Sequence, residues 1–189
     1  MLDEPFSSLD ALLRQDMRRT LREILRAEGT TAILVTHDQE EALQTADRVA
    51  VMQAGRIDQI GTPEEIYATP RTLFVAQFLG QTNLTLADAH GATADTPLGT
   101  LDLHREAEGT VLVALRPEHV QILPEAEGDG QEGTVVERAY KGHDVTYRVK
   151  LDPHGIDCLV HSPLPDFAIG DRVRVRAIQP AVVLDKAGG

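Results

Sequence analysis

The stretch Thr31-Ala-Ile-Leu-Val-Thr-His-Asp-Gln-Glu-Glu-Ala42 changes from apolar to polar at His37. Residues 31–36 are apolar or β-branched and show no polar alternation, which predicts a strand buried on both faces of a parallel sheet. Asp38, with Glu41 three residues later, resembles a capping box and predicts a helix to about residue 46. The sequence therefore predicts a strand followed directly by a helix, with His37 at the carboxyl end of the strand.

An amphipathic helix is predicted over residues 10–28, because apolar residues recur there at helical spacing. Its other faces carry arginines alternating with Asp16 and Glu23, which is typical of an ordinary solvent-exposed face. Upstream, Leu2-Asp3-Glu4-Pro5 resembles the end of another strand. Strand, helix and strand then form a βαβ unit, in which the two strands run parallel.

The carboxyl ends of these two predicted strands carry Asp3, Glu4 and His37. Ligands bind outside the carboxyl ends of the strands in such sheets, so we expect the three side chains to converge. An Asp, a Glu and a His together favour metal-assisted phosphoryl chemistry, with one acid on Mg²⁺, one acting on water and the histidine on the transferred group. The spacing does not identify the substrate, and the acids could equally be a solvated pair or a helix cap.

Further elements follow along the chain. A strand is predicted at residues 49–52 before a turn at 54–56, and helices at 62 onward and at 72–79. After Gly80 the pattern changes to short alternating runs, which predict a small β-barrel or sandwich with a polar acidic loop at 125–132. The predicted strands are residues 111–115, 133–139, 145–151, 156–161 and 172–178. The predicted fold class is thus an α/β part over residues 1–80, a joint at 81–83, and an all-β domain over 84–189.

The composition excludes several classes of protein. With 42% hydrophobic and 25% charged residues the chain resembles an ordinary soluble globular protein. A net charge of -12 and only 4% aromatic residues argue against nucleic-acid binding. Cys158 is the single cysteine, so we expect a buried thiol and a reducing cytoplasm rather than a disulfide. No apolar run approaches membrane-spanning length and no signal peptide is recognisable, so any link to a membrane is expected to run through a partner.

Several ordered motifs resemble the second half of an ABC-transporter nucleotide-binding domain. They are Leu2-Asp-Glu-Pro-Phe-Ser-Ser-Leu-Asp10, Val35-Thr-His-Asp-Gln-Glu-Glu-Ala42, Asp47-Arg-Val-Ala-Val-Met52, Gly55-Arg-Ile57 and Gly61-Thr-Pro-Glu-Glu-Ile-Tyr67. The chain is most similar to importer subunits of the maltose, polyamine and ferric-iron type, which end in a small OB-like (TOBE) regulatory domain. Ala114-Leu-Arg-Pro-Glu-His119 is similar to part of that final domain.

The resemblance implies roles for five residues. Asp3 corresponds to the Walker B acid that binds Mg²⁺, and Glu4 to the general base. Ser8 and Asp10 lie in the D-loop, which reaches across an ATPase dimer, although Asp10 could also be the N-cap of the helix. His37 corresponds to the histidine that contacts the γ-phosphate of ATP. The implied partners are transmembrane permease subunits, a second ATPase subunit and, indirectly, a periplasmic solute-binding protein, with the chain on the cytoplasmic face of the membrane.

The sequence departs from that family in lacking a Gly-x-x-x-x-Gly-Lys-Ser/Thr loop, a Q-loop and a Leu-Ser-Gly-Gly-Gln signature. We therefore expect no ATP turnover by this chain alone. We also expect an incomplete sheet with exposed apolar surface, and from it a homodimer. The resemblance favours ferric iron or polyamines over sugars as the solute. The alternative is a non-catalytic regulatory or dimerising module, in which the β-domain over residues 84–189 binds an effector or a partner subunit.

Overall fold

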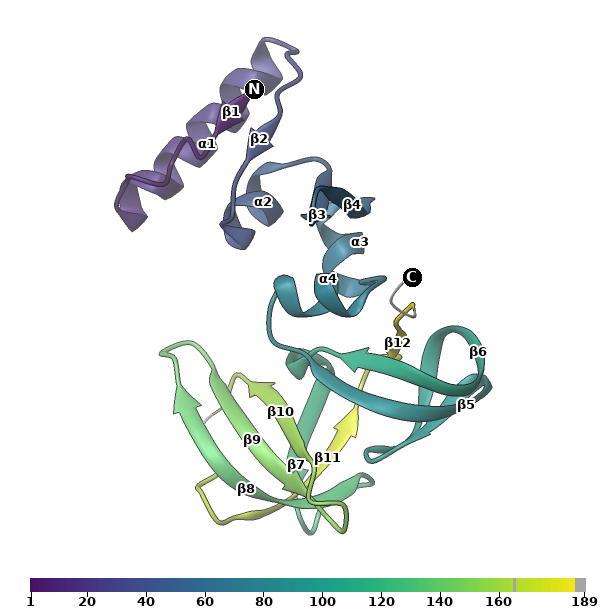
Figure 1. Ribbon diagram of the computed structural model, residues 1–189. Helices are drawn as coiled ribbons and strands as arrows, with labels where there is room; N and C mark the ends of the chain where they lie inside the picture. Colours follow the sequence, from purple (N-terminus) through teal and green to yellow (C-terminus); the bar gives the residue numbers. More distant parts are fainter. Residues whose placement is uncertain (165, 186–189) are drawn as a thin grey trace. The chain divides into compact units, whose positions relative to one another are not determined.

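The computed structural model describes residues 1–164 and 166–185, and the chain divides into two compact units, Met1–Pro70 and Arg71–Gly189. The first unit begins with β1 (Leu2–Asp3), α1 (Ala11–Ala27), β2 (Leu34–Val35) and α2 (Gln39–Thr45). It continues with β3 (Val49–Gln53), β4 (Arg56–Gly61) and α3 (Pro63–Ala68). In the sequence β1 precedes α1 and β2 follows it, and the two strands pair in parallel, as the βαβ prediction requires (Figure 1).

Side-chain caps start the helices of this unit where the sequence predicts them. Asp10 accepts a hydrogen bond from the Leu13 N–H at 2.9 Å, and this fixes the first turn of α1. Thr62 and Glu65 form a complete capping box at α3, with Pro63 in its first turn. Asp38 caps α2 through the Glu41 N–H, but the Glu41 carboxylate binds the Thr36 hydroxyl instead of returning to the cap. The predicted capping box is therefore half formed.

The strand predicted over residues 31–36 is shorter and more exposed than expected. Only Leu34–Val35 pair with β1, and Ile33 and Val35 are 62% and 44% exposed. The expectation of a strand buried on both faces is wrong for this unit. A parallel strand becomes buried only when other strands and helices cover it, and here the parallel sheet has two strands.

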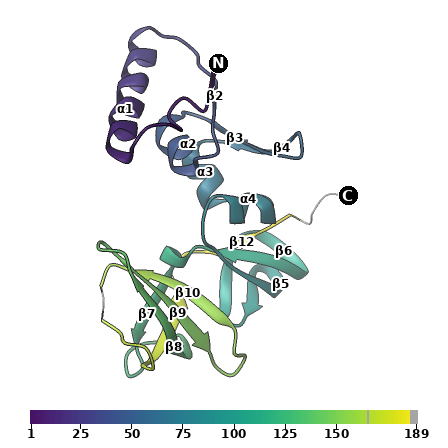
Figure 2. The ribbon, with the colours of Figure 1, turned by 60° about the vertical axis from the view of Figure 1, so that its left-hand side comes forward.

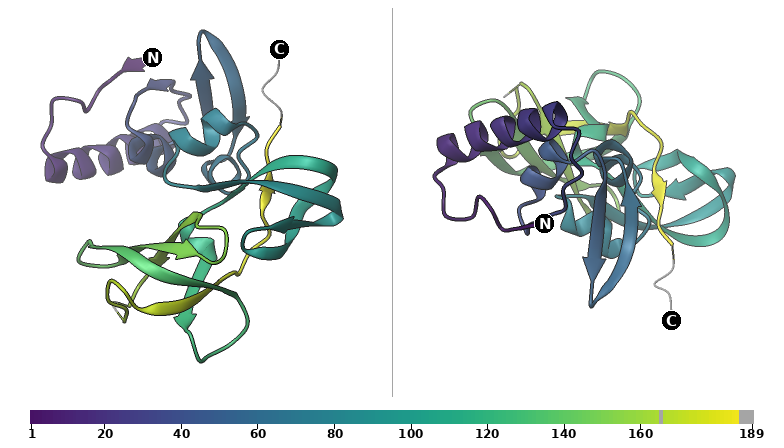
Figure 3. Two further views of the ribbon diagram at one scale, coloured as in Figure 1. Left: turned by 60° about the horizontal axis from the view of Figure 1, so that its bottom comes forward. Right: turned by 90° about the horizontal axis from the view of Figure 1, so that it is seen from above.

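The segment after α2 forms an antiparallel hairpin. β3 pairs with β4 across a turn at Ala54 and Gly55, which have φ angles of 48° and 78°. Two consecutive residues with positive φ produce the backbone twist that tight hairpins need. The strand predicted at 49–52 is confirmed, and its ribbon with β4 is visible in steel blue in Figure 3.

The second unit is built almost entirely of strands. It contains α4 (Leu73–Phe78), β5 (Asn83–Thr96), β6 (Gly99–Leu115), a short 3-10 helix η1 (Pro117–His119), β7 (Val120–Pro124), β8 (Gln131–Tyr140), β9 (Val145–Leu151), β10 (Asp157–Ser162), β11 (Arg172–Ala177) and β12 (Val182–Val183). The strands form a five-stranded sheet in the order β10-β9-β8-β11-β7 and a three-stranded sheet in the order β12-β6-β5. Both sheets are strongly curled (Figure 2), as expected for an OB-like domain.

The core of this unit lies between the two sheets and is rich in β-branched residues. Tyr147, Val149, Val160, Val173 and Val175 are fully buried in it. The ring of Tyr147 packs edge-on against Phe167, with the ring centroids 5.9 Å apart. Alternating inward residues on β8, β9 and β11 thus account for the period-2 pattern that predicts these strands.

A long twisted hairpin, β5–β6, accounts for most of what the sequence pattern missed. Only residues 111–115 of β6 were predicted to be a strand, whereas the hairpin spans residues 83–115. Its inward side consists largely of Ala87, Ala89 and Ala94, which are at most 3% exposed. Alanine has a low strand propensity, so these positions carry no local signal for a strand. β7 and β12 were also not predicted, and β8 begins inside the acidic segment expected to be a loop.

Arg116 anchors the segment that leads into the β5–β6 hairpin. Its guanidinium is buried, and Nη1 donates to the carbonyl oxygens of Ala76, Gly80 and Gln81 at 3.0–3.2 Å. α4 therefore groups with the β-rich unit, although the sequence placed it before the domain joint. No helix in the described residues has both the length and the apolar character needed to cross a bilayer.

Candidate functional site

The pairing of β1 with β2 places two polar turns next to each other. Leu2 pairs with Leu34 and Asp3 with Val35, and the Glu4 N–H donates to the Val35 carbonyl at 2.8 Å. Both strands end at the same edge because they run parallel. The residues that follow, Glu4 after β1 and His37 after β2, therefore face the same region.

Glu4 and His37 are in direct contact there. Glu4 Oε1 lies 2.6 Å from His37 Nδ1 and accepts a second hydrogen bond from the His37 backbone N–H at 3.1 Å. Glu4 has a φ of 46°, a left-handed conformation that is uncommon outside glycine and is found at functional sites. The Ser7 hydroxyl donates to the Glu4 carbonyl at 3.0 Å and stabilises this tight turn.

The contact changes the acid–base behaviour of His37. The hydrogen bond to the Glu4 carboxylate, and then its negative charge, raise the pKa of His37 above 6.5. The His37 side chain is 80% exposed, so the second ring nitrogen, Nε2, is open to a ligand. When the ring is protonated, Nδ1 donates to Glu4 and Nε2 is a charged donor suited to a phosphate oxygen.

Asp38, directly after His37, is held at both carboxylate oxygens. Oδ1 accepts from the Glu41 N–H at 3.1 Å, and Oδ2 accepts from Arg14 at 3.2 Å and from Arg18 at 2.9 Å. Burial raises the pKa of Asp38, but the Glu41 N–H and the Arg18 guanidinium lead the opposing effects, and the net shift is downward. Asp38 is therefore a firmly ionised anchor beside the histidine.

The other predicted site residues lie at the same edge but make fewer contacts. Asp3 is exposed on β1, and Ser8 is exposed in the turn before α1. Within residues 1–164 and 166–185, neither side chain has a hydrogen bond or ion pair. Asp10 caps α1 through Leu13. The structure thus brings Glu4 and His37 together and leaves Asp3 and Ser8 open to solvent, while the catalytic and nucleotide-binding roles of these residues stay predictions.

The strand ends offer one exposed carboxylate, that of Asp3, as a candidate Mg²⁺ ligand. No group of three metal-ligating side chains occurs in the described residues. Mg²⁺ bound to nucleotides, however, needs only one or two carboxylates, because phosphates and water complete its octahedron. An exposed carboxylate on Asp3, beside the Glu4–His37 pair, fits that requirement.

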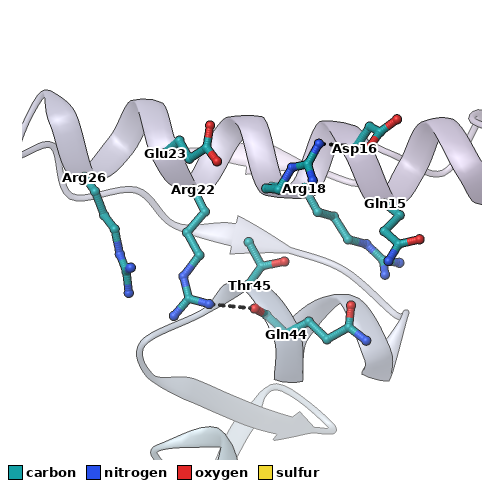
Figure 4. Close-up of a pocket in the computed structure, with 9 residues that line it drawn as sticks. Gln15, Asp16, Arg18, Arg22, Glu23, Arg26, Gln44 and Thr45 are labelled. Atoms are coloured by element: carbon teal, nitrogen blue, oxygen red, sulfur yellow. Dashed lines mark hydrogen bonds and ion pairs between the residues drawn. The ribbon is translucent and has the colours of Figure 1, made fainter.

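Sequence reasoning missed the arginine network behind this site. Arg18 is only 8% exposed, so the expectation of an ordinary solvent-exposed face on α1 is wrong at this position. The i, i+4 spacing of Arg14, Arg18 and Arg22 was the available signal, since it places all three on one helical face. Arg22 donates to the Gln44 carbonyl at 3.0 Å, so this face contacts α2 (Figure 4).

A cavity of about 590 Å³ lies along the same face of α1. It is lined by Gln15, Asp16, Arg18, Arg19, Arg22, Glu23, Arg26, Gln44 and Thr45 (Figure 4). Four arginines and two acids line it, and the arginines are paired with Asp16, Asp38 and Asp47. Each of these arginines therefore already faces a carboxylate, which argues against a free anion site in the cavity.

The opposite side of α1 is apolar and exposed. Leu13 is 45% exposed, Met17 37% and Ile24 54%, and Ile33 beside β2 is 62% exposed. Apolar side chains spaced along one face of a helix normally pack against another element. The expected exposed apolar surface is therefore confirmed in this unit.

Several known proteins similar to this chain are named as import ATP-binding proteins. Residues 113–184 match the TOBE domain family. A Fe(3+) ions import ATP-binding protein, FbpC 2 of Rhodococcus jostii, is 41% identical over 98% of this chain and 55% of its own length. A spermidine/putrescine import ATP-binding protein, PotA of Borreliella afzelii, is 42% identical over 86% of this chain and 47% of its own length.

A third relative, the Fe(3+) ions import ATP-binding protein FbpC of Streptomyces coelicolor, is 45% identical over 82% of this chain and 44% of its own length. The chain therefore spans about half the length of the curated relatives it matches. The matched half is the C-terminal region of those proteins.

Proposed function

We propose that this chain supplies two parts of an ATP-binding subunit of an ABC importer: the strand ends that carry Asp3, Glu4 and His37, and the TOBE domain. The premise is its match to the C-terminal region of such subunits. ATP hydrolysis by the subunit would drive uptake of a solute through membrane-embedded permease partners. The observation that best supports this proposal is the Glu4–His37 contact at the ends of two parallel strands.

The geometry suggests a separate catalytic role for Glu4 and for His37. Glu4 uses Oε1 for both hydrogen bonds to His37, which leaves Oε2 to accept a proton from an attacking water. His37, held by Nδ1, presents Nε2 to the negative charge that builds up on the transferred phosphoryl group. One carboxylate thus orients the histidine and acts as general base.

Asp3 and the turn at residues 8–10 have complementary roles in the proposal. The exposed Asp3 carboxylate would hold Mg²⁺, which neutralises charge on the phosphates of bound ATP. Ser8 and Asp10 would contact the second ATP-binding subunit, because the residues before α1 are open to solvent next to the site. The exposed apolar face of α1 supports contact with further protein, and we propose a homodimer of complete subunits.

The alternative of a purely regulatory module is not favoured. The similarity to import ATP-binding proteins extends over 98% of the chain, and so includes the Asp3, Glu4 and His37 region as well as the TOBE domain. Ferric iron and polyamines are the proposed solute classes, because relatives named for each match at comparable identity. We place the subunit on the cytoplasmic face of the membrane, with a solute-binding protein acting on the far side.

The proposal is tested in the cells that make this protein, with an affinity tag placed after Gly189 on the chromosomal gene. The tagged protein is purified from membranes, and Mg²⁺-dependent ATPase activity is measured for the wild type and for Glu4→Gln. We expect the substitution to reduce activity about 100-fold or more, since it removes the general base. Uptake of ferric iron and of spermidine, measured in the same two strains, identifies the solute.

Glu23→Gln is the matched control, because Glu23 is an exposed acid on α1 that lies away from the strand ends. It should leave ATPase activity and uptake unchanged. ATPase activity that is equal in wild type and Glu4→Gln, or a membrane preparation without permease proteins, would rule out the proposed function.

A further inference from the structure

Arg14 connects two turns that flank the Glu4–His37 pair. Its Nη2 donates to the carbonyl oxygen of Leu9 at 3.0 Å, and its Nη1 donates to Asp38 Oδ2 at 3.2 Å. Leu9 lies in the turn before α1, and Asp38 directly follows His37. A planar guanidinium with several fixed donors is suited to such a bridge, whereas a lysine ammonium is a point charge.

The Asp38 end of this bridge is rigid. Arg18 donates to the same Asp38 oxygen at 2.9 Å, and the Asp38 N–H donates to the Thr36 hydroxyl at 3.0 Å. Thr36 in turn donates to the buried carboxylate of Glu41 at 2.8 Å. The residues on both sides of His37 are therefore fixed by hydrogen bonds, and a displacement of Asp38 would displace the histidine.

The Leu9 end of the bridge is where a second subunit would act. Arg18 already neutralises Asp38, so the distinctive contact of Arg14 is the one with the Leu9 carbonyl. The same turn contains Ser8 and ends at Asp10, the N-cap of α1. Arg14 is thus the direct side-chain link between this turn and the His37 segment.

We propose that Arg14 is a positioning residue that holds His37 against Glu4 and transmits changes in the turn at residues 8–10 to that pair. This inference rests on the proposed function, in which the turn meets the second ATP-binding subunit while Glu4 and His37 act on the phosphate. Docking of the second subunit would then align the catalytic pair through Arg14. Without Arg14, docking of the second subunit would no longer align Glu4 and His37.

The test follows the hydrogen bond between the His37 backbone N–H and Glu4 Oε1 by amide hydrogen exchange, measured by NMR on the 189-residue chain without nucleotide. Arg14→Lys keeps the charge but cannot span both acceptors. We expect exchange at His37 to become roughly fivefold faster, the factor associated with one typical hydrogen bond. The His37 ring signals should shift as well, since Nδ1 contacts the same carboxylate oxygen.

Arg19→Lys is the matched control, because Arg19 is on the same helix, is 73% exposed and, among the described residues, pairs with the neighbouring Asp16 alone. It should leave His37 exchange unchanged. Amide protection in the middle of α1 shows whether the first unit stays folded. If Arg14→Lys and Arg14→Gln both abolish that protection, Arg14 is a stability residue and the proposal is overturned. Unchanged His37 exchange in a folded variant overturns it as well.

Transmission from the turn is tested with Asp10→Ala, which removes the cap of α1. We expect it to speed His37 exchange when Arg14 is present and to add little in the Arg14→Lys background. Equal effects in both backgrounds would exclude transmission through Arg14. Since these measurements need no ATP, they can fail while the ATPase test succeeds, and the two ideas are judged separately.

Discussion

The side-chain amide of Asn83 forms two hydrogen bonds with the backbone of Leu159. Asn83 Nδ2 donates to the Leu159 carbonyl at 2.8 Å, and the Leu159 N–H donates to Asn83 Oδ1 at 2.7 Å. The amide thus satisfies both backbone groups of Leu159, as a neighbouring strand would. Asn83 is the first residue of β5 and Leu159 lies in β10, so the pair connects the edges of the two sheets.

Asn83→Ala is expected to destabilise the β-rich unit by about 1–3 kcal/mol, because a backbone donor and acceptor lose their partners. Asn83→Asp should also destabilise it, since a carboxylate keeps the acceptor but opposes the Leu159 carbonyl. Urea unfolding followed by NMR signals of β9 and β10 measures the change. Asp88→Ala, an exposed substitution on the same strand, is the control; equal stabilities for Asn83→Ala and this control would contradict the prediction.

Arg116→Ala should destabilise the β-rich unit more than Asn83→Ala does. The guanidinium is 4% exposed and serves three backbone carbonyls, so its removal leaves buried acceptors without a donor. We expect a loss of about 2–4 kcal/mol from the same unit. Arg138→Ala, at an exposed arginine of β8, should change the free energy of unfolding by less than about 0.5 kcal/mol. A loss no larger than that of Arg138→Ala would mean that α4 does not depend on this anchor.

Glu4→Gln should lower the pKa of His37 toward 6.5, because the neutral amide no longer stabilises the imidazolium. The pKa of His37 is raised in the folded protein, so its contact with Glu4 stabilises the folded state. This stabilisation is fully present below pH 6.5 and is lost as the pH rises through the pKa of His37 in the folded protein. Titration of the histidine ring signals by NMR measures both proteins. Glu23→Gln is the control, and the same His37 titration in both variants would show that the contact does not persist in solution.

Cys158 should be inert in the native protein. Burial raises the pKa of its thiol to about 12, and the residue is 2% exposed. At pH 8 the thiolate population is then about a thousandfold lower than that of a free cysteine, so a disulfide reagent should label the folded chain extremely slowly. Labelling in urea provides the comparison, with the adduct read by mass spectrometry. Rapid labelling of the folded chain would reveal opening of β10.

Local signals in the sequence predicted the helices well. Asp10 and Thr62 begin α1 and α3 as the capping patterns indicate, and Gly29 follows the end of α1 with a φ of 59°. These predictions succeeded because a capping side chain and the backbone N–H that donates to it lie three residues apart. The long β5–β6 hairpin was missed because its inward alanines, such as Ala89, have no local preference for a strand.

The candidate site was only partly predictable. Parallel strand ends placed Glu4 and His37 at one edge, and the structure shows them in contact. The burial of Arg18 could not be predicted from composition, because arginine is rarely buried unless it is paired, and its partner Asp38 lies 20 residues away. The exposure of Val35 likewise depends on which elements cover β2, not on the residue itself.

By itself the sequence determined where helices begin, which segments alternate as strands, and which residue types stand at the strand ends, since these features depend on interactions over a few residues. Only the tertiary structure decided that Glu4 meets His37 across 33 residues and that Arg14 binds Asp38 across 24. Such contacts depend on strand pairing and on helix packing, and those are set by the chain as a whole.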